Sequence, residues 1–174
     1  RKIPVILKNT LEPDDPGTVI RSVTAYEDYK AVAAKDNITA IRITSDRMLM
    51  SYGFMRKVFE IFEVYRTAID MIATSEVSVS LTVDMTDNLP DIVNELRRLG
   101  SVEVESDQTI ICVVGDFRTG RTGSAPEIFQ ALDYIPLKMI SYGASQISIS
   151  LLIDSIHKQD ALRSLHKHLF SGKK

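Results

Sequence analysis

Residues 77–84 are Val77-Ser78-Val79-Ser80-Leu81-Thr82-Val83-Asp84, and residues 147–154 are Ile147-Ser148-Ile149-Ser150-Leu151-Leu152-Ile153-Asp154. In the first stretch apolar residues alternate with polar ones, which predicts a half-buried β-strand with one polar face. The second stretch begins 70 positions later and also ends on an aspartate. A match at this spacing indicates that the chain holds two copies of one small module.

The alignment of the two copies extends beyond these strands. The further pairs are Gly53 with Gly123, Val58-Phe59 with Ile128-Phe129, and Met71-Ile72 with Met139-Ile140 after a shift of two residues. Apolar residues at helical spacing predict helices over 54–65, over 89–99, from Ser124 onward and over 160–170. Alternating or apolar runs predict strands over 39–43, 68–72, 77–84, 102–104, 109–114, 137–140 and 147–153. Each copy therefore predicts the βαββαβ order of a ferredoxin-like sandwich, which is an α+β fold.

The second copy lacks a last strand, because only four residues follow Phe170. A sheet edge left open there would invite aggregation. We expect the run Ala31–Ala34, which has no place in the first copy, to supply the missing strand. The first module, 38–107, would then be nested in the second, which comprises 30–37 and 108–172. Residues 1–29, rich in proline and turn-forming residues, are predicted to be a linker or the tail of an upstream domain.

Composition excludes several functional classes. The net charge is −2, with 21 basic and 23 acidic residues, so the basic excess of a nucleic-acid-binding protein is missing. No apolar run is long enough to span a membrane, and the chain has one cysteine, Cys112, too few for a disulfide framework or a CxxC metal site. We expect a cytoplasmic protein without nucleic-acid or membrane partners, and the sequence offers no metal or catalytic residues.

One constellation in the first copy could bind an amino acid. The loop that ends at Gly53 leads into a predicted helix, whose first N–H groups, from Gly53 to Met55, favour an anion such as a carboxylate. Acidic residues on the neighbouring strands, Asp70 and Glu76, suit an ammonium group. A ligand with two ammonium groups, such as lysine, could use both acids. The alternative is that both acids are solvated turn residues and that Ser51 is a simple helix cap.

Two motifs resemble the regulatory region of aspartate kinase (aspartokinase). They are the run from Asp70 to Ser80 and the run from Met139 to Ser145, the latter followed by Ile149-Ser150. The N-terminal Ile3-Pro4-Val5 and Pro16-Gly17-Thr18 resemble the passage from that family's kinase domain into its regulatory part. The resemblance spans essentially the whole chain.

This resemblance implies a pair of ACT domains, small βαββαβ modules that bind amino acids. The parent enzyme would phosphorylate L-aspartate with ATP and Mg²⁺, giving 4-phospho-L-aspartate on the route to lysine, threonine and methionine. The family's Lys-Phe-Gly-Gly-type motif and nucleotide residues are missing from this sequence. The chain is therefore expected to need no cofactor, to lack kinase activity alone and to act with an N-terminal kinase domain.

The resemblance also implies an effector site in the first module, commonly at a homodimer interface. The residues it transfers are Met48, Ser51, Gly53, Phe54, Met55, Ile69, Asp70, Thr74, Ser75 and Glu76. They resemble the lysine-sensitive type, so L-lysine is the expected feedback inhibitor. Met50, Tyr52 and Ala73 depart from that type and affect the effector's identity. The alternatives are a threonine-responsive pair and a purely structural dimerisation module.

Overall fold

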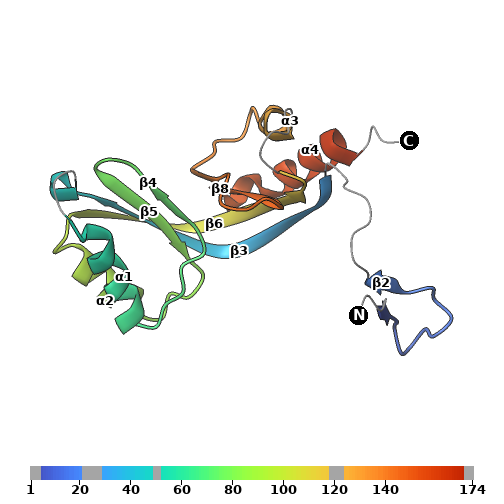
Figure 1. Cartoon of the computed structure of the whole chain (residues 1–174), viewed down its shortest axis with the longest axis horizontal. Coiled ribbons are helices and arrows are strands. Elements are labelled where there is room, and N and C mark those ends of the chain that lie inside the picture. Colours follow the sequence, from blue (N-terminus) through green and yellow to red (C-terminus); the bar gives the residue numbers. More distant parts are fainter. Residues whose placement is uncertain (1–4, 21–28, 49–51, 118–123, 171–174) are drawn as a thin grey trace.

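A computed structural model describes residues 5–20, 29–48, 52–117 and 124–170. Its main feature is a six-stranded sheet in the order β4-β5-β3-β6-β8-β7 (Figure 1). The two central strands, β3 (Tyr29–Thr44) and β6 (Ser101–Gly115), are long and pair antiparallel along their length. They run through both halves of the sheet, so the two halves share their central strands.

The first half of the sheet is built on the C-terminal part of β3. This part pairs with β5 (Ser78–Val83), and β5 pairs with the edge strand β4 (Ile72–Thr74). Helices α1 (Phe54–Val64) and α2 (Leu89–Leu96) pack on it through one apolar cluster. The resulting order β4-β5-β3-β6 is that of a ferredoxin-like sandwich, as the repeat predicts.

The second half mirrors the first. The C-terminal part of β6 pairs with β8 (Ser148–Asp154), which pairs with the edge strand β7 (Met139–Ser141). Helices α3 (Ser124–Ala131) and α4 (Lys158–Phe170) belong to the hydrophobic cluster of this half. The order β7-β8-β6-β3 repeats that of the first half, because the N-terminal part of β3 takes the fourth position.

The run Ala31–Ala34 pairs with Val114–Ile111 of β6, which is the pairing that a nested arrangement requires. The domain boundaries themselves stay a prediction. The sequence predicts separate strands over 31–34 and 39–43. This prediction was wrong, because β3 is one strand that continues through Asp36-Asn37. Asn37 has a φ of 58° and Asp107 in β6 a φ of 56°, and the pairing shifts register in this region. An irregularity of this kind bends a strand pair without ending it.

The two helix pairs pack against different parts of β3. Val32 and Ala34 face the cluster of α3 and α4, whereas Ile41 and Ile43 lie in the cluster of α1 and α2. Figure 1 shows α1 and α2 on one side of the sheet and α3 and α4 on the other.

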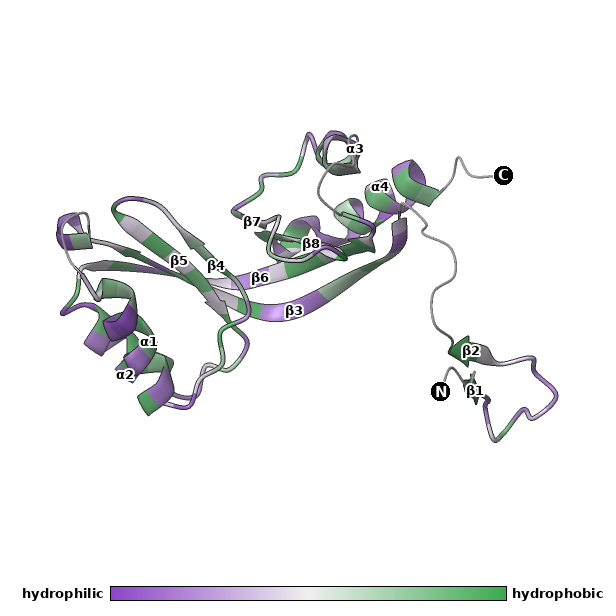
Figure 2. Cartoon of the chain, viewed as in Figure 1, coloured by the Kyte–Doolittle hydropathy of each residue, from purple (hydrophilic) through white to green (hydrophobic). Residues whose placement is uncertain are grey.

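A third cluster lies where the two halves meet. Its buried members are Ile38, Met71, Ile110, Met139 and Leu152. Met71 and Met139 occupy equivalent positions in the repeat. Met71 directly precedes the edge strand β4, Met139 is the first residue of the edge strand β7, and these two strands contact each other. Beside this cluster the middle of β3 is hydrophilic (Figure 2). We call this cluster, with the charged residues around it, the junction.

Other boundaries differ from the sequence prediction by a few residues. β4 covers 72–74 instead of 68–72, and α2 ends at Leu96 instead of Leu99. Short 3₁₀ turns cover Asp46–Met48 and Ser155–His157. Within the predicted linker, β1 (Val5–Leu7) and β2 (Thr18–Ile20) form an antiparallel hairpin, because the proline-rich turn segment between them reverses the chain. Residues 1–4 and 21–28 lie outside the described residues.

Replacing Gly100 with alanine should destabilise the fold by about 1–3 kcal/mol. An added Cβ would lie 2.4 Å from the backbone oxygen of Thr44, where β3 ends. Urea unfolding followed by circular dichroism measures the change. Gly143→Ala is the control, since a Cβ there meets nothing within 4 Å and only the positive φ of 89° costs about 1 kcal/mol. A smaller effect at Gly100 than at Gly143 would contradict the steric explanation.

Candidate functional site

The candidate site begins where α1 begins. Gly53 precedes the helix with a φ of 81°, a left-handed conformation that glycine adopts without strain. No side chain of a described residue caps this end. The first N–H groups of the helix therefore have no side-chain acceptor among the described residues, which favours an anion beside them. Ser51, which was predicted as a contact or a cap, lies outside the described residues.

The turn from Thr74 to Glu76 lies at the same end of the first module. Ser45, directly after β3, donates its N–H to Val77 O at 2.8 Å, and Met48 N donates to Ser45 O at 3.0 Å. The Ser75 and Ser78 hydroxyls lie 2.7 Å apart and fix the turn. The structure therefore brings the turn together with the segment before α1. Glu76 is exposed and forms no ion pair with another described residue.

Four predicted contacts are mainly packing residues. Phe54 is buried, with 6% of its surface exposed, in the cluster of the first half. Met48 and Met55 are partly buried and pack against the same cluster, as does Ile69. Their side chains shape the first module, so at Phe54 the group that a ligand can reach is the backbone N–H. The helical apolar stripe points the Phe54 side chain inward, and a contact through its N–H stays a prediction.

Asp70 lies at the other end of β4. Its N–H donates to Thr82 O at 2.9 Å, whereas Thr74 pairs with Val79. At about 3.3 Å per residue of extended chain, Asp70 and Thr74 are separated by about 13 Å. Within one chain, the structure does not bring Asp70 to the start of α1. The predicted site residues thus form two groups, one at each end of β4.

Sequence reasoning missed Lys35, the partner of Asp70. The Lys35 ammonium lies 2.6 Å from Asp70 Oδ1 and 2.9 Å from Asp84 Oδ2. Hydrogen bonds to Asp70 and then Asp84 raise the pKa of Lys35 above its ordinary value, and the bond from Lys35 lowers the pKa of Asp84. The available signal was a single lysine at the end of the alanine-rich run Ala31–Ala34.

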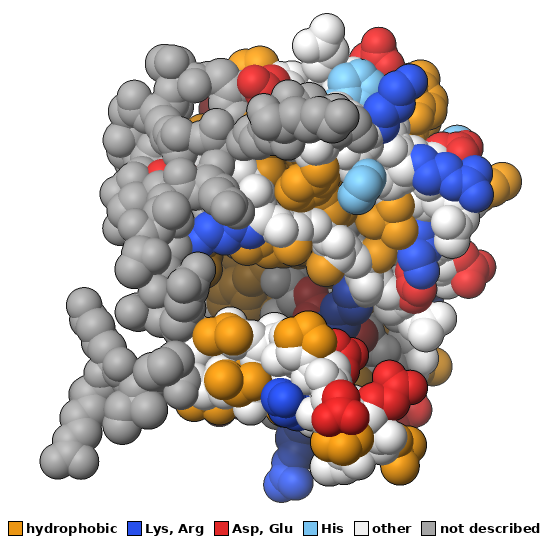
Figure 3. Space-filling model, turned by 90° about the vertical axis from the view of Figure 1, so that its right-hand side faces the viewer, with side chains coloured by type: hydrophobic (Ala, Val, Ile, Leu, Met, Phe, Trp, Pro, Cys, Tyr) orange, Lys and Arg blue, Asp and Glu red, His pale blue; other side chains and the backbone are white. Residues whose placement is uncertain are grey.

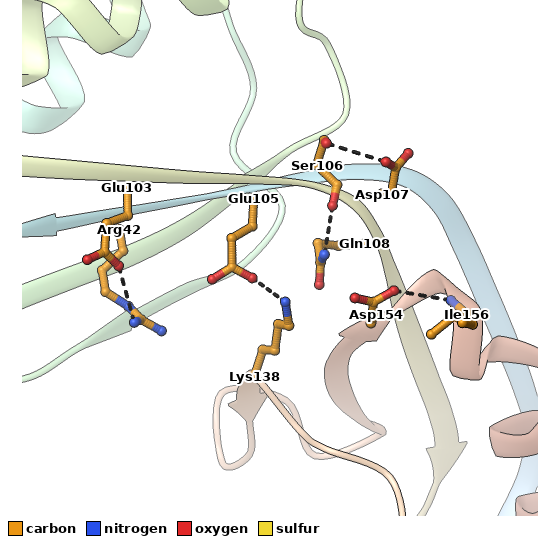
Figure 4. A network of polar contacts seen from close by, with 9 residues as sticks. All are labelled: Arg42, Glu103, Glu105, Ser106, Asp107, Gln108, Lys138, Asp154 and Ile156. Carbon is orange, nitrogen blue, oxygen red and sulfur yellow. Dashed lines mark hydrogen bonds and ion pairs between the residues drawn. The ribbon is translucent and has the colours of Figure 1, made fainter.

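Further ion pairs surround the junction. Lys138, just before β7, pairs with Glu105 of β6, and Arg42 lies 3.5 Å from Glu103 (Figure 4). Lys158 of α4 pairs with Asp36, next to Lys35. The carboxylates and ammonium groups at the junction are therefore engaged with one another.

The described surface also has a groove on the side of α4. Figure 3 shows hydrophobic side chains with histidines among them on the side of the molecule toward α4, and a groove there is lined by Lys30, Ala31, Val32, Leu162, His166 and Phe170. Within the described part of the chain, no three histidine, cysteine or acidic residues cluster in a way that could hold a metal. A helix long and apolar enough to cross a membrane is likewise missing from those residues.

Comparisons with known proteins agree with this architecture. Residues 111–169 match the ACT domain family model. A solved structure assigned as the C-terminal regulatory domain of aspartate kinase, from Porphyromonas gingivalis W83, is 49% identical, with a TM-score of 0.75. The match covers 83% of this chain and 99% of that one. The chain belongs to the family of aspartate kinase regulatory domains. The family's ACT fold is the ferredoxin-like α+β arrangement that the sheet order shows.

Longer relatives are complete kinases. Aspartokinase 2, chloroplastic, from Arabidopsis thaliana is 34% identical over 97% of this chain, which spans 34% of that protein. Escherichia coli aspartokinase III, solved in complex with lysine and aspartate (T-state), is 31% identical, with a TM-score of 0.85, over 97% of this chain and 39% of that one. The chain thus spans about a third of the length of the relatives it matches.

Proposed function

We propose that this chain is the regulatory part of an aspartate kinase and binds L-lysine as the feedback inhibitor. The observation that carries the proposal is the exposed Thr74–Glu76 turn, which lies beside the segment Ser45–Met48 before α1, a helix whose start has no side-chain cap among the described residues. The lysine carboxylate suits the helix start, and its ammonium groups suit Glu76 and Asp70. The lysine present in the Escherichia coli aspartokinase III structure supports this choice of ligand.

A complete site needs two chains. The two groups of site residues lie about 13 Å apart along β4, farther than one extended lysine reaches. Among the described strands, the edge strand β4 pairs with β5 alone, and Ile72 in it is 41% exposed. An open edge with an apolar residue favours pairing with a second copy. We therefore expect a homodimer through the first modules, in which the helix start of one chain faces Asp70 of the other.

The proposed parent enzyme transfers the γ-phosphoryl group of ATP to the side-chain carboxylate of L-aspartate, with Mg²⁺ in its kinase domain. The present chain contributes regulation. It is expected to be inactive alone, because its sequence lacks the kinase motifs of the family. Lysine would act by binding one of two arrangements of the enzyme more tightly than the other.

Isothermal titration calorimetry of the 174-residue chain should show saturable binding of L-lysine and weaker binding of L-threonine. Threonine has no second ammonium group, so it can engage only one of Asp70 and Glu76. Sedimentation velocity should show a dimer. Tighter binding of threonine would favour the threonine-responsive alternative. A folded dimer that binds neither amino acid at millimolar concentration would favour a purely structural role.

A further inference from the structure

Two lysines form ion pairs across the junction in equivalent places. Lys35 lies in the part of β3 that pairs with the second half of the sheet, opposite Ile110, whereas its partners Asp70 and Asp84 belong to the first half. Lys138 of the second half reaches in the same way to Glu105 of β6. Asp70 directly precedes Met71, and Lys138 directly precedes the equivalent methionine, Met139. The repeat therefore has an acidic residue at one of these equivalent positions and a basic residue at the other.

The Lys35 contact differs from an ordinary surface ion pair. One ammonium group bridges two carboxylates, Asp70 at 2.6 Å and Asp84 at 2.9 Å, which would repel each other without it. The raised pKa of Lys35 agrees with this geometry. Asp70 remains 24% exposed, so a ligand can approach the carboxylate that Lys35 holds.

We propose that Lys35 is an internal competitor for the effector's ammonium group, and that effector binding at Asp70 releases Lys35 and loosens the junction. The inference rests on the proposed lysine site, whose regulation it describes. The exchange replaces one alkylammonium by another, so the charge beside Asp70 stays balanced. Asp84 stays paired with the displaced Lys35, so Lys35 remains close enough to return to Asp70 when the effector leaves. Effector binding in the first module thereby changes a contact of β3, the strand that the two halves of the sheet share.

The thiol of Cys112 can report on the opening of the junction. Lys35, Asp70, Met71, Ile110 and Cys112 are among the residues that line a hollow of about 250 Å³ at the junction. Cys112 is the single cysteine of the chain and is partly exposed. The rate at which its thiol reacts with a disulfide reagent therefore reports how open the junction is.

The decisive comparison uses the whole chain and the variant Lys35→Met, which keeps a side chain of similar length without the charge. Titration with L-lysine should show binding about three- to tenfold tighter than in the unsubstituted protein, because the competitor is gone. Lys138→Met is the matched control: it removes the equivalent ion pair without touching Asp70, so the affinity should be unchanged. Urea unfolding confirms that both variants are folded.

The reaction rate of the Cys112 thiol tests the release of Lys35 independently of the affinity measurement. Saturating L-lysine should speed the reaction of Cys112 several-fold in the unsubstituted protein. In Lys35→Met the reaction should be fast without lysine and unaffected by it. Equal affinities, or a Cys112 rate that lysine leaves unmoved in the unsubstituted protein, would overturn the inference while leaving the lysine site intact. Absence of lysine binding in both proteins would overturn the proposed site and the inference together.

Discussion

Replacing Glu76 with glutamine should weaken L-lysine binding by about ten- to a hundredfold, because a charge-assisted hydrogen bond contributes about 1.5–3 kcal/mol. The substitution keeps the shape of the side chain and removes its charge. Glu76 is exposed and has no cation to lose among the described residues, so its whole interaction with an ammonium ligand would disappear. Isothermal titration of the variant and the unsubstituted chain measures the change.

The same change at Asp70 should cost less. Asp70→Asn removes a contact with the effector, but it also removes the contact that Lys35 makes in the absence of effector, at 2.6 Å. The two losses partly cancel, since binding depends on the difference between the free and the bound states. Glu63→Gln, an exposed position near the other end of α1, is the charge-matched control and should leave affinity unchanged. Equal affinity in Glu76→Gln and the unsubstituted chain would reject Glu76 as a ligand contact.

Local patterns predict what depends on local structure. The alternation from Val77 to Asp84 predicts β5, and its copy predicts β8, because one-sided burial forces a period of two. The repeat then predicts the ferredoxin-like order. The continuity of β3 could not be predicted in this way. Aspartate and asparagine favour turns, and at Asp36-Asn37 the chain stays extended because the residues on either side pair with β6, some 70 residues away in the sequence.

In the candidate site too, the local features could be predicted from the sequence, whereas the long-range contacts could not. The turn from Thr74 to Glu76 and the start of α1 are local features, and the sequence indicates both. The apolar stripe of α1 points the Phe54 side chain into the core, which leaves its backbone N–H as the group that was predicted to meet the ligand. The only local signal of Lys35 is its place at the end of an alanine-rich run, because its partners lie 35 and 49 positions away and meet it only through the sheet. Which acids are free for a ligand is therefore a property of the folded chain.

Replacing Met71 with alanine should lower the free energy of unfolding by about 2–4 kcal/mol, the usual cost of truncating a buried methionine. Met71 is 6% exposed and belongs to the junction cluster with Met139, which lies at the equivalent position of the other half. Urea unfolding measures the loss. Met85→Ala is the matched control, since Met85 is 52% exposed and its truncation should cost less than about 0.5 kcal/mol.

The double variant of Met71 and Met139 shows whether the junction acts as one core. Both side chains lie in the same cluster, so the second truncation would enlarge an existing cavity and the two costs should differ from additivity by about 0.5 kcal/mol or more. Strict additivity would mean that each methionine stabilises only its own half. Coupling would mean that the halves stabilise each other through their edge strands. That mutual dependence is what allows a contact as small as the one between Lys35 and Asp70 to influence both.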